Sequence, residues 1–281
     1  MSRLTLALVL LVGLLAGGFG ALALRTGPNA AQVQAMIGAA LQQQAPAPVQ
    51  TAAFDSGKVN QLIENYLLSD PTILTRMNDK LAEDKHVAER KAEKDLLTAH
   101  AADIYDADGN VVLGNPKGDV TLVEMFDYNC SYCRGALPDL ASLMAQDPNL
   151  KVILKDFPIL TAGSVDAARV AVLVAQNPAI NYWTFHQQLF SQRGEVGASQ
   201  ALQVAENLGG NRVELMLDMN GPKPNAVIQK NYDLAKALNA SGTPTYILGD
   251  EIIPGALGID QLKVKIANIR ACGSTECPAS G

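Results

Sequence analysis

The chain has 281 residues and a formal net charge of −6, and charged residues make up 18% of it. This length is sufficient for one or two domains with a substantial core, and the acidic balance without an arginine-rich run excludes nucleic acid as an expected partner. The four cysteines form two close pairs, too few for a small disulfide-rich scaffold, and three histidines make a histidine-rich metal site unexpected.

An uncharged and almost wholly apolar segment opens the chain, from Leu4 to Leu24, between two arginines. A membrane-spanning helix needs about 20 such residues, whereas the apolar part of a cleaved signal peptide has about 7–15. We therefore expect residues 1–25 to be an uncleaved signal-anchor. A cleaved signal peptide is the alternative, because Ala21-Leu22-Ala23 resembles a cleavage site. Either form exports the rest of the chain.

A linker and a helical extension are expected next. Residues 26–53 are rich in Ala, Gln and Pro, which predicts a flexible linker with a short helix at residues 31–43. Residues 54–100 have helical periodicity, and Asp70 followed by Pro71 is typical of the start of a second helix in this extension. The apolar residues that recur at intervals of three and four are Val59, Leu62, Ile63, Tyr66, Leu67, Ile73, Leu74, Met77 and Leu81.

Charged side chains dominate the extension from Glu83 to Lys94, so this part has too little apolar surface to form a stable helix alone. Two interpretations remain open: a solvated connector, or an arm that pairs with another chain. We favour the arm, which makes residues 54–100 a candidate contact of a homo-oligomer.

Residues 101–270 have the pattern of one α/β domain, and residues 271–281 form a tail with the second cysteine pair. The run from Val120 to Phe126 is apolar except for one Thr and Glu124, which predicts a central strand that is buried on both faces. Helical periodicity extends over residues 164–240. The other expected elements are a short strand-and-turn region at 104–113 with its turn at Asp108-Gly109, a helix at 131–145, a strand at 151–155, a hairpin of 245–248 with 251–253, and a helix at 259–270.

The sequence Cys130-Ser131-Tyr132-Cys133 lies between the end of the central strand and the start of the next helix. The unpaired N–H groups and the dipole of a helix N-terminus stabilise negative charge, so we expect an exposed Cys130 thiol with a pKa below its ordinary value of about 8.5. Cys133, one turn into the helix, is expected to be buried and to resolve mixed disulfides. This arrangement predicts a redox-active pair, and Pro138 is expected to kink the helix behind it.

Two other interpretations of the cysteines remain open at this point. Cys130 and Cys133 fit half of a structural zinc site, with Cys272 and Cys277 as the other half, although the spacing of that second pair is at the upper edge of the usual range. The first pair also fits a structural disulfide, the default for cysteines in an exported protein. We favour the redox pair because it lies at a strand-to-helix junction.

Several segments carry a family likeness when they are taken together. Residues 126–134, with the CxxC at their end, resemble the active-site segment of the DsbA-like thiol:disulfide oxidoreductases, which have the thioredoxin fold. Residues 113–119 and 155–160 fit the same group. The run Ser241-Gly242-Thr243-Pro244-Thr245 resembles the cis-proline loop of thioredoxin-fold proteins. Residues 63–68 resemble the helical extension of the subgroup that includes the copper-sensitivity suppressor protein ScsC.

The resemblance covers roughly residues 58–270. It implies a thioredoxin fold with a helical insertion at about residues 164–225, preceded by the helical extension and the membrane anchor or signal segment. The implied protein is an exported oxidoreductase that oxidises, reduces or isomerises protein disulfides through the CxxC. It would work in the periplasm, tethered to the inner membrane by residues 4–24 or released if they are cleaved. The residues between the cysteines favour the isomerase or reductase direction.

The resemblance also assigns roles to residues around the cysteines. It implies that Pro244 is the cis proline that faces Cys130, with Thr243 before it. It implies that Glu124 is the buried acid that assists proton transfer to the deeper thiol, because burial raises the pKa of a carboxyl. The alternative for Glu124 is an ion pair with Lys155 on the neighbouring strand.

Further residues receive structural expectations. Asp127 and Tyr128 are expected to frame the site rather than react. His186 lies among aromatic residues on a helix and is expected to pack rather than to catalyse. Cys272 and Cys277 lie beyond the resemblance, and we expect them to form a structural disulfide. A second redox pair is the alternative.

The expected partners are protein substrates with thiols or disulfides, a membrane redox partner and, through residues 54–100, a second copy of the chain. No cofactor is expected beyond the redox-active disulfide, and no metal. The alternative function is a periplasmic copper(I)-binding or chaperone protein that uses the same CxxC, because soft thiolates suit that ion.

Overall fold

The computed structural model describes residues 29–43 and 55–278, and the chain divides into two units, residues 1–73 and 74–281. The expected signal-anchor at residues 4–24 and part of the expected linker lie outside the described residues. Among the helices of the described residues, none has the length and apolar character needed to cross a membrane.

The first unit contains helix α2, Ala30–Gln43, and helix α3, Ser56–Ser69. The Asp55 carboxylate begins α3 by accepting hydrogen bonds from the N–H groups of Gly57 and Lys58, which satisfies donors that a first turn leaves unpaired. None of the residues of α3, all of which are described, is buried. Its exposed apolar side chains are Leu62, Ile63, Tyr66, Leu67 and Leu68.

Helix α4, Thr72–Ala99, begins after the Asp70-Pro71 pair. The Asp70 N–H donates to the carbonyl of Tyr66 at the end of α3, and the Asp70 carboxylate accepts a hydrogen bond from the N–H of Thr72. The same residue therefore ends one helix and begins the next, as a helix-capping aspartate does. The exposed apolar residues of α4 are Leu74, Met77, Leu81 and Val87.

The second unit is built, within the described residues, on a five-stranded sheet in the order β1-β3-β2-β4-β5. Strands β2 and β3 are parallel, and the other neighbours are antiparallel. Parallel neighbours need a crossover connection, and helix α6, Ser131–Gln146, supplies it. The strands are β1 Val111–Gly114, β2 Val120–Phe126, β3 Leu150–Asp156, β4 Thr245–Leu248 and β5 Glu251–Pro254.

Successive residues of β2 point to opposite faces of the sheet and enter two different cores. Leu122 and Phe126 belong to the core that α6 and helix α12, Ile259–Cys272, contribute to. Val123 and Met125 belong to the other core. That second core also contains Leu97 of α4, Ile104 of helix α5 (Ala101–Tyr105) and Leu234 of helix α11 (Pro222–Ala237).

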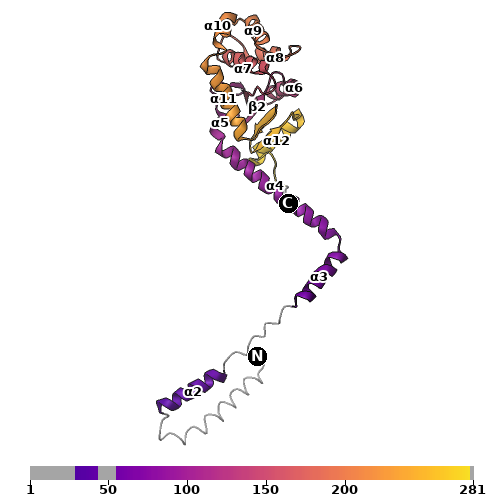
Figure 1. Ribbon diagram of the computed structural model, residues 1–281, viewed down its shortest axis with the longest axis vertical. Coiled ribbons are helices and arrows are strands. Elements are labelled where there is room, and N and C mark those ends of the chain that lie inside the picture. Colours follow the sequence, from indigo (N-terminus) through magenta and orange to yellow (C-terminus); the bar gives the residue numbers. More distant parts are fainter. Residues whose placement is uncertain (1–28, 44–54, 279–281) are drawn as a thin grey trace. The chain divides into compact units, whose positions relative to one another are not determined.

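Helices α7 to α11 follow one another between β3 and β4 and form a helical insertion. Helix α7 packs against α9 and α11, and Figure 1 shows α7, α8, α9 and α10 together at one end of the second unit. The expected thioredoxin-like α/β fold with a helical insertion and N-terminal helices is confirmed. The remaining helices are α7 Ala162–Ala175, α8 Tyr182–Phe190, α9 Ala198–Asn207 and α10 Arg212–Asp218.

Candidate active site

Cys130 caps the N-terminus of α6, at the point where the chain leaves β2. Its sulfur accepts a hydrogen bond from the N–H of Cys133 at 3.1 Å and lies 3.1 Å from the carbonyl oxygen of Thr243. Both cysteines are free thiols, 3% and 1% exposed. Cys130 is thus less exposed than expected because the loop that carries Thr243 lies against its sulfur, whereas Ser131 and Tyr132 are exposed.

The two thiols have opposite electrostatic environments. Hydrogen bonding with the Cys133 side chain is the largest cause that lowers the pKa of Cys130, and hydrogen bonds with Thr243 and nearby N–H groups lower it as well. Burial raises the pKa, and the net value is about 6. Burial, and then the hydrogen bond with Cys130, raise the pKa of the Cys133 thiol well above its ordinary value. At neutral pH the pair therefore holds a thiolate on Cys130 and a proton on Cys133. This is the division of roles that the spacing predicts.

The peptide bond between Thr243 and Pro244 is cis. The Thr245 hydroxyl donates to the carbonyl of Gly242 at 2.8 Å, and the N–H of Gly255 donates to the carbonyl of Pro244 at 2.8 Å. These bonds hold the loop ahead of β4 so that the Thr243 carbonyl faces the reactive sulfur. The structure therefore brings the loop and the CxxC together, as the resemblance implies.

Glu124 lies in the middle of β2 and is 5% exposed. Its neighbours across the sheet are Leu154 on β3 and Tyr246 on β4. Burial, and to a smaller extent the negative charge of Cys130, raise the pKa of the Glu124 carboxyl to about 8. The side chain therefore carries a proton at neutral pH, on the sheet face that also holds Cys133.

The alternative of an ion pair between Glu124 and Lys155 is wrong. Glu124 pairs in register with Leu154, so Lys155, the next residue along β3, points to the opposite face of the sheet. The Lys155 ammonium donates to the carbonyls of Asp103 and Asp106 at 3.1 and 2.7 Å. Burial lowers the pKa of Lys155 to about 8, and the charges of Asp106 and Asp103 oppose this. Lys155 therefore anchors the end of α5, away from the cysteines.

Asp127 frames the site through its buried carboxylate. One carboxylate oxygen accepts the N–H of Asn129 at 2.8 Å, and the other accepts the N–H groups of Ile159 and Leu160 at 2.8 and 2.9 Å. The carboxylate thereby joins the segment before Cys130 to the loop after β3. A charged residue directly after a buried strand was the sequence signal for this role.

Sequence reasoning missed Asn129, the residue directly before Cys130. Its side-chain oxygen accepts the N–H of Val196 at 2.7 Å, and its amide nitrogen donates to the carbonyl of Val196 at 2.9 Å and to the Ser164 hydroxyl at 3.0 Å. These bonds join the CxxC segment to the start of α7 and to the loop before α9. Their partners are distant in sequence, and the position next to Cys130 was the only signal.

Tyr128 connects the end of β2 to helix α8 through a buried polar cluster. Its hydroxyl lies 3.1 Å from the Tyr182 hydroxyl and 3.1 Å from Nδ1 of His186. Burial lowers the pKa of His186 to about 3, so the ring is neutral, and its tautomer decides whether Nδ1 donates to or accepts from the Tyr128 hydroxyl. His186 is stacked with Tyr182 and Trp183, which is the packing role expected of it.

The zinc interpretation is wrong. Cys272 and Cys277 are joined in a disulfide, so they are not ligands that complete a site with Cys130 and Cys133. Within residues 29–43 and 55–278, no cluster of three or more His, Cys, Asp or Glu side chains is placed to hold a metal ion.

A stabilised thiolate with a protonated thiol behind it is the reacting group of thiol:disulfide oxidoreductases with the thioredoxin fold. The comparison with known families agrees, because residues 121–267 match the family model described as the DSBA-like thioredoxin domain. The chain therefore belongs to the family of DSBA-like thioredoxin domains.

Three solved structures show how far the similarity extends. A thioredoxin-like oxidoreductase from Silicibacter pomeroyi DSS-3 is 35% identical, with a TM-score of 0.58, over 61% of this chain and 98% of that one. The thiol-disulfide exchange protein alpha-DsbA2 from Wolbachia pipientis is 27% identical, with a TM-score of 0.60, over 65% and 98%. A linker-deletion mutant of Proteus mirabilis ScsC shares the fold at 23% identity and a TM-score of 0.60, over 80% and 99%. The chain spans 25% of the length of the first curated relatives that it matches.

Proposed function

We propose that this chain is an exported thiol:disulfide oxidoreductase that exchanges disulfides with protein substrates through Cys130 and Cys133. The observation that carries the proposal is the asymmetry of the two thiols, since the pKa of Cys130 is lowered to about 6 while that of Cys133 is raised. The thiolate is the attacking species in disulfide exchange. Cys130 is therefore a thiolate at neutral pH and can attack a disulfide, whereas Cys133 remains a protonated thiol.

The reaction proceeds through a mixed disulfide. The Cys130 thiolate attacks one sulfur of a substrate disulfide, and the other substrate sulfur leaves as a thiolate and takes up a proton. Cys133 then loses its proton and attacks Cys130, which releases the second substrate sulfur. The products are a Cys130–Cys133 disulfide and a reduced substrate, and the reverse sequence oxidises a substrate dithiol.

Glu124 is the base that we propose for the proton of Cys133. Two causes raise the pKa of this carboxyl to about 8, burial first and the negative charge of Cys130 second. In the mixed disulfide Cys130 is neutral, so the second cause disappears and the carboxylate forms more readily. The base therefore becomes available at the step in which Cys133 must lose its proton.

Isomerisation is the direction that we propose for the exchange. A lowered pKa of Cys130 stabilises the reduced pair, which makes the protein a weaker reductant. The same thiolate is an effective nucleophile at neutral pH, and an isomerase must begin by attacking a wrong disulfide. The result is a protein that attacks disulfides readily and is released again when the substrate rearranges.

A homo-oligomer through residues 54–100 is part of the proposal. Helix α3 buries none of its residues, and its exposed apolar side chains include Leu62 and Leu67, 69% and 42% exposed. Exposed apolar residues that recur along a helix favour a helical partner. Substituting Leu62→Glu with Leu67→Glu should lower the mass measured by light scattering, whereas Gln61→Glu should not. An unchanged mass in both variants would remove the oligomer from the account.

The proposed compartment is the periplasm, where the chain is tethered by residues 4–24 or released after cleavage, and where a membrane protein resets its redox state. An oxidising compartment suits this chain because the structure contains the Cys272–Cys277 disulfide. Spheroplast fractionation tests the placement. Recovery of the protein with the cytoplasmic fraction contradicts it.

The activity is tested by reduction of insulin and refolding of scrambled ribonuclease, with wild type, Cys130→Ser and the neighbouring control Ser131→Ala. Wild type and Ser131→Ala should be active in both assays, and Cys130→Ser in neither. If wild type is inactive in every glutathione buffer and binds copper(I) tightly in competition with a chelator, the copper alternative replaces this proposal. Nothing in the part of the chain that the structure describes favours that alternative.

A further inference from the structure

The second cysteine pair closes a small ring at the end of helix α12. Cys272 is the last residue of α12, Gly273 ends the helix with a φ of 79°, and the disulfide to Cys277 completes the ring. Both cysteines are exposed, whereas Thr275 between them is 1% exposed. The ring therefore places both cysteines at the surface of the protein and buries Thr275.

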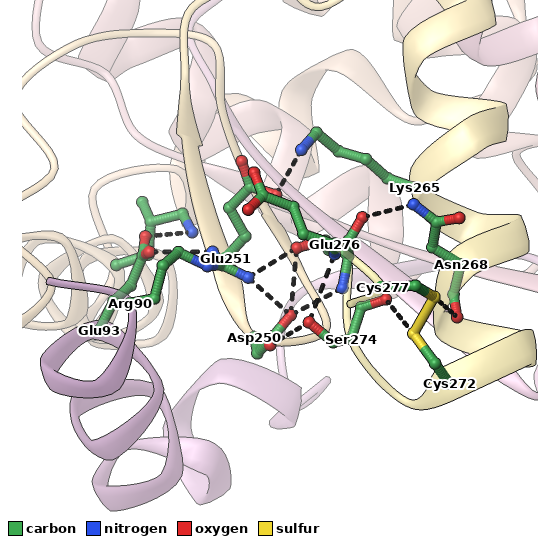
Figure 2. A network of polar contacts seen from close by, with 12 residues as sticks. Arg90, Glu93, Asp250, Glu251, Lys265, Asn268, Cys272, Ser274, Glu276 and Cys277 are labelled. Atoms are coloured by element: carbon green, nitrogen blue, oxygen red, sulfur yellow. Dashed lines mark hydrogen bonds and ion pairs between the residues drawn. A yellow bond between two sulfur atoms is a disulfide. The ribbon is translucent and has the colours of Figure 1, made fainter. Parts of the chain in front are cut away.

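Asp250, in the turn between β4 and β5, is hydrogen-bonded to residues of the ring (Figure 2). Its carboxylate accepts the N–H of Thr275 at 2.9 Å, the Thr275 hydroxyl at 3.1 Å and the Ser274 hydroxyl at 2.7 Å. The Asn268 amide on α12 donates to the carbonyl of Thr275 at 2.8 Å. The polar groups of the inserted residue are thereby satisfied, as burial requires.

The same residues hold helix α4. The Arg90 guanidinium donates to the Thr275 hydroxyl at 2.8 Å and lies 3.1 Å from the Asp250 carboxylate. Arg90 also pairs with Glu93 at 3.2 Å, and the Glu93 carboxylate accepts the N–H of Ile252 on β5 at 2.6 Å. The side chains of Arg90 and Asp250 are only 18% and 15% exposed, so solvent screens this contact less than a surface ion pair.

The contact of Arg90 with Thr275 depends on the disulfide. A segment that no crosslink restrains loses conformational entropy when it docks. The disulfide restricts residues 273–276 before they dock, so that the cost is smaller. Without the ring, α4 keeps its apolar anchor through Leu97 in the core, the bond from Glu93 and the ion pair of Arg90 with Asp250, but it loses the contact with Thr275.

A second catalytic role does not suit this pair. Cys272 is at the C-terminus of α12, where the helix dipole disfavours a thiolate, and the neighbouring Glu276 adds negative charge. An attacking thiol needs the opposite environment, as at Cys130. Because both cysteines are exposed residues, an external dithiol can nonetheless exchange with their disulfide.

We propose that Cys272–Cys277 is a redox modification site that controls how firmly α4 is held at the turn between β4 and β5. A dithiol reductant breaks the sulfur–sulfur bond and itself becomes a disulfide, and both cysteines become thiols. Loop 273–276 then leaves Asp250, and Arg90 loses the Thr275 hydroxyl. Because α4 also carries the exposed Leu74, Met77 and Leu81, the disulfide state sets how rigidly this apolar stripe is presented.

Hydrogen exchange measured by mass spectrometry tests the site in the full chain. Cys130→Ser with Cys133→Ser is the background, so that dithiothreitol acts on the second pair alone. Amides of residues 86–93 should exchange about tenfold faster after reduction, and reoxidation should restore their protection. Cys272→Ser with Cys277→Ser should exchange at the fast rate under either condition. Equal exchange in the oxidised and reduced proteins would overturn the proposal.

Two further variants test whether the disulfide acts on α4 through Thr275 and Arg90 or through a general loosening of the region. Lys265→Ala removes a 2.6 Å bond between α12 and Glu251 that does not reach α4, so exchange at residues 86–93 should not change. Arg90→Ala should speed exchange more in the oxidised protein than in the variant with serine at positions 272 and 277, where only the pairs of Arg90 with Asp250 and Glu93 remain to be lost. Additive effects of Arg90→Ala and the serine pair would contradict the route through Arg90.

Discussion

The sulfur of Cys130 lies 3.1 Å from the main-chain nitrogen of Cys133. Hydrogen bonding with the Cys133 side chain is also the largest cause that lowers the pKa of Cys130 to about 6. Cys133 therefore stabilises a negative charge on Cys130, and in the proposed mechanism it does so before it takes part in the reaction itself. Any change at position 133 should be measurable as a change in the thiolate at position 130.

Cys133→Ala should raise the pKa of Cys130 from about 6 toward its ordinary value, because the side-chain hydrogen bond is lost while the main-chain N–H remains. The thiolate absorbance near 240 nm, followed as a function of pH, measures this. Ser131→Ala, which alters an exposed residue of the same turn, should leave the titration unchanged. A titration midpoint that stays near 6 in Cys133→Ala contradicts the assigned cause.

Glu124→Gln should slow the resolution of mixed disulfides, because glutamine has nearly the same shape but accepts no proton. General base catalysis commonly contributes about 100-fold or more, so a fall of that order is expected in stopped-flow measurements. The attack of Cys130 on a small disulfide should change much less. A resolution rate within about twofold of wild type would remove Glu124 from the proposed mechanism.

The pKa of Glu124 also predicts how stability depends on pH. Its value is raised from 4.5 to about 8 in the folded protein, so its contribution to stability is fully present below pH 4.5. That contribution is lost as the pH rises toward about 8, because the unfolded carboxyl ionises while the folded one stays protonated. Relative to Glu124→Gln, the free energy of unfolding of wild type should therefore fall by a few kcal/mol between pH 4.5 and about 8. The reason is that a tenfold change in proton affinity is worth about 1.36 kcal/mol.

Urea unfolding of the two reduced proteins at several pH values measures this difference. In a Cys130→Ser background the pH dependence should be smaller, because the negative charge of Cys130 is one of the two causes that raise the pKa of Glu124. A difference between wild type and Glu124→Gln that does not vary with pH would show that the buried carboxyl titrates normally.

Asp127→Ala should destabilise the protein strongly, because three main-chain N–H groups lose their acceptor. An unsatisfied buried donor costs about 1–3 kcal/mol, so a loss of about 3 kcal/mol or more is expected in chemical denaturation. Asp127→Asn keeps one oxygen and should lose less. Asp218→Ala, at an exposed position of α10, should stay within about 0.5 kcal/mol.

The sequence was sufficient to predict those features that depend only on residues close together in the chain. The apolar run from Val120 to Phe126 predicts a strand that is buried on both faces, and its residues do enter two different cores. The CxxC follows directly, so its place at the start of a helix could be predicted from neighbouring residues alone. The burial of Glu124 follows from the same run.

Features that depend on distant contacts could not be predicted. An ion pair with Lys155 was the alternative for Glu124, and only the register between β2 and β3 shows that the two side chains lie on opposite faces. Asn129 bonds Val196 and Ser164 across long stretches of chain. Arg90, in a charged helix, gave no sign of its contact with Asp250, because the turn and the disulfide ring that form its site are more than a hundred residues away.

Trapping of the mixed disulfide tests the central claim most directly. Cys133→Ser should retain a scrambled ribonuclease substrate as a covalent complex, and peptide mass spectrometry should place the bond on Cys130. Cys130→Ser should trap nothing, and Cys272→Ser with Cys277→Ser should react like wild type. A substrate bond on Cys272 or Cys277, or no complex with Cys133→Ser at any pH between 6 and 8, would contradict the account.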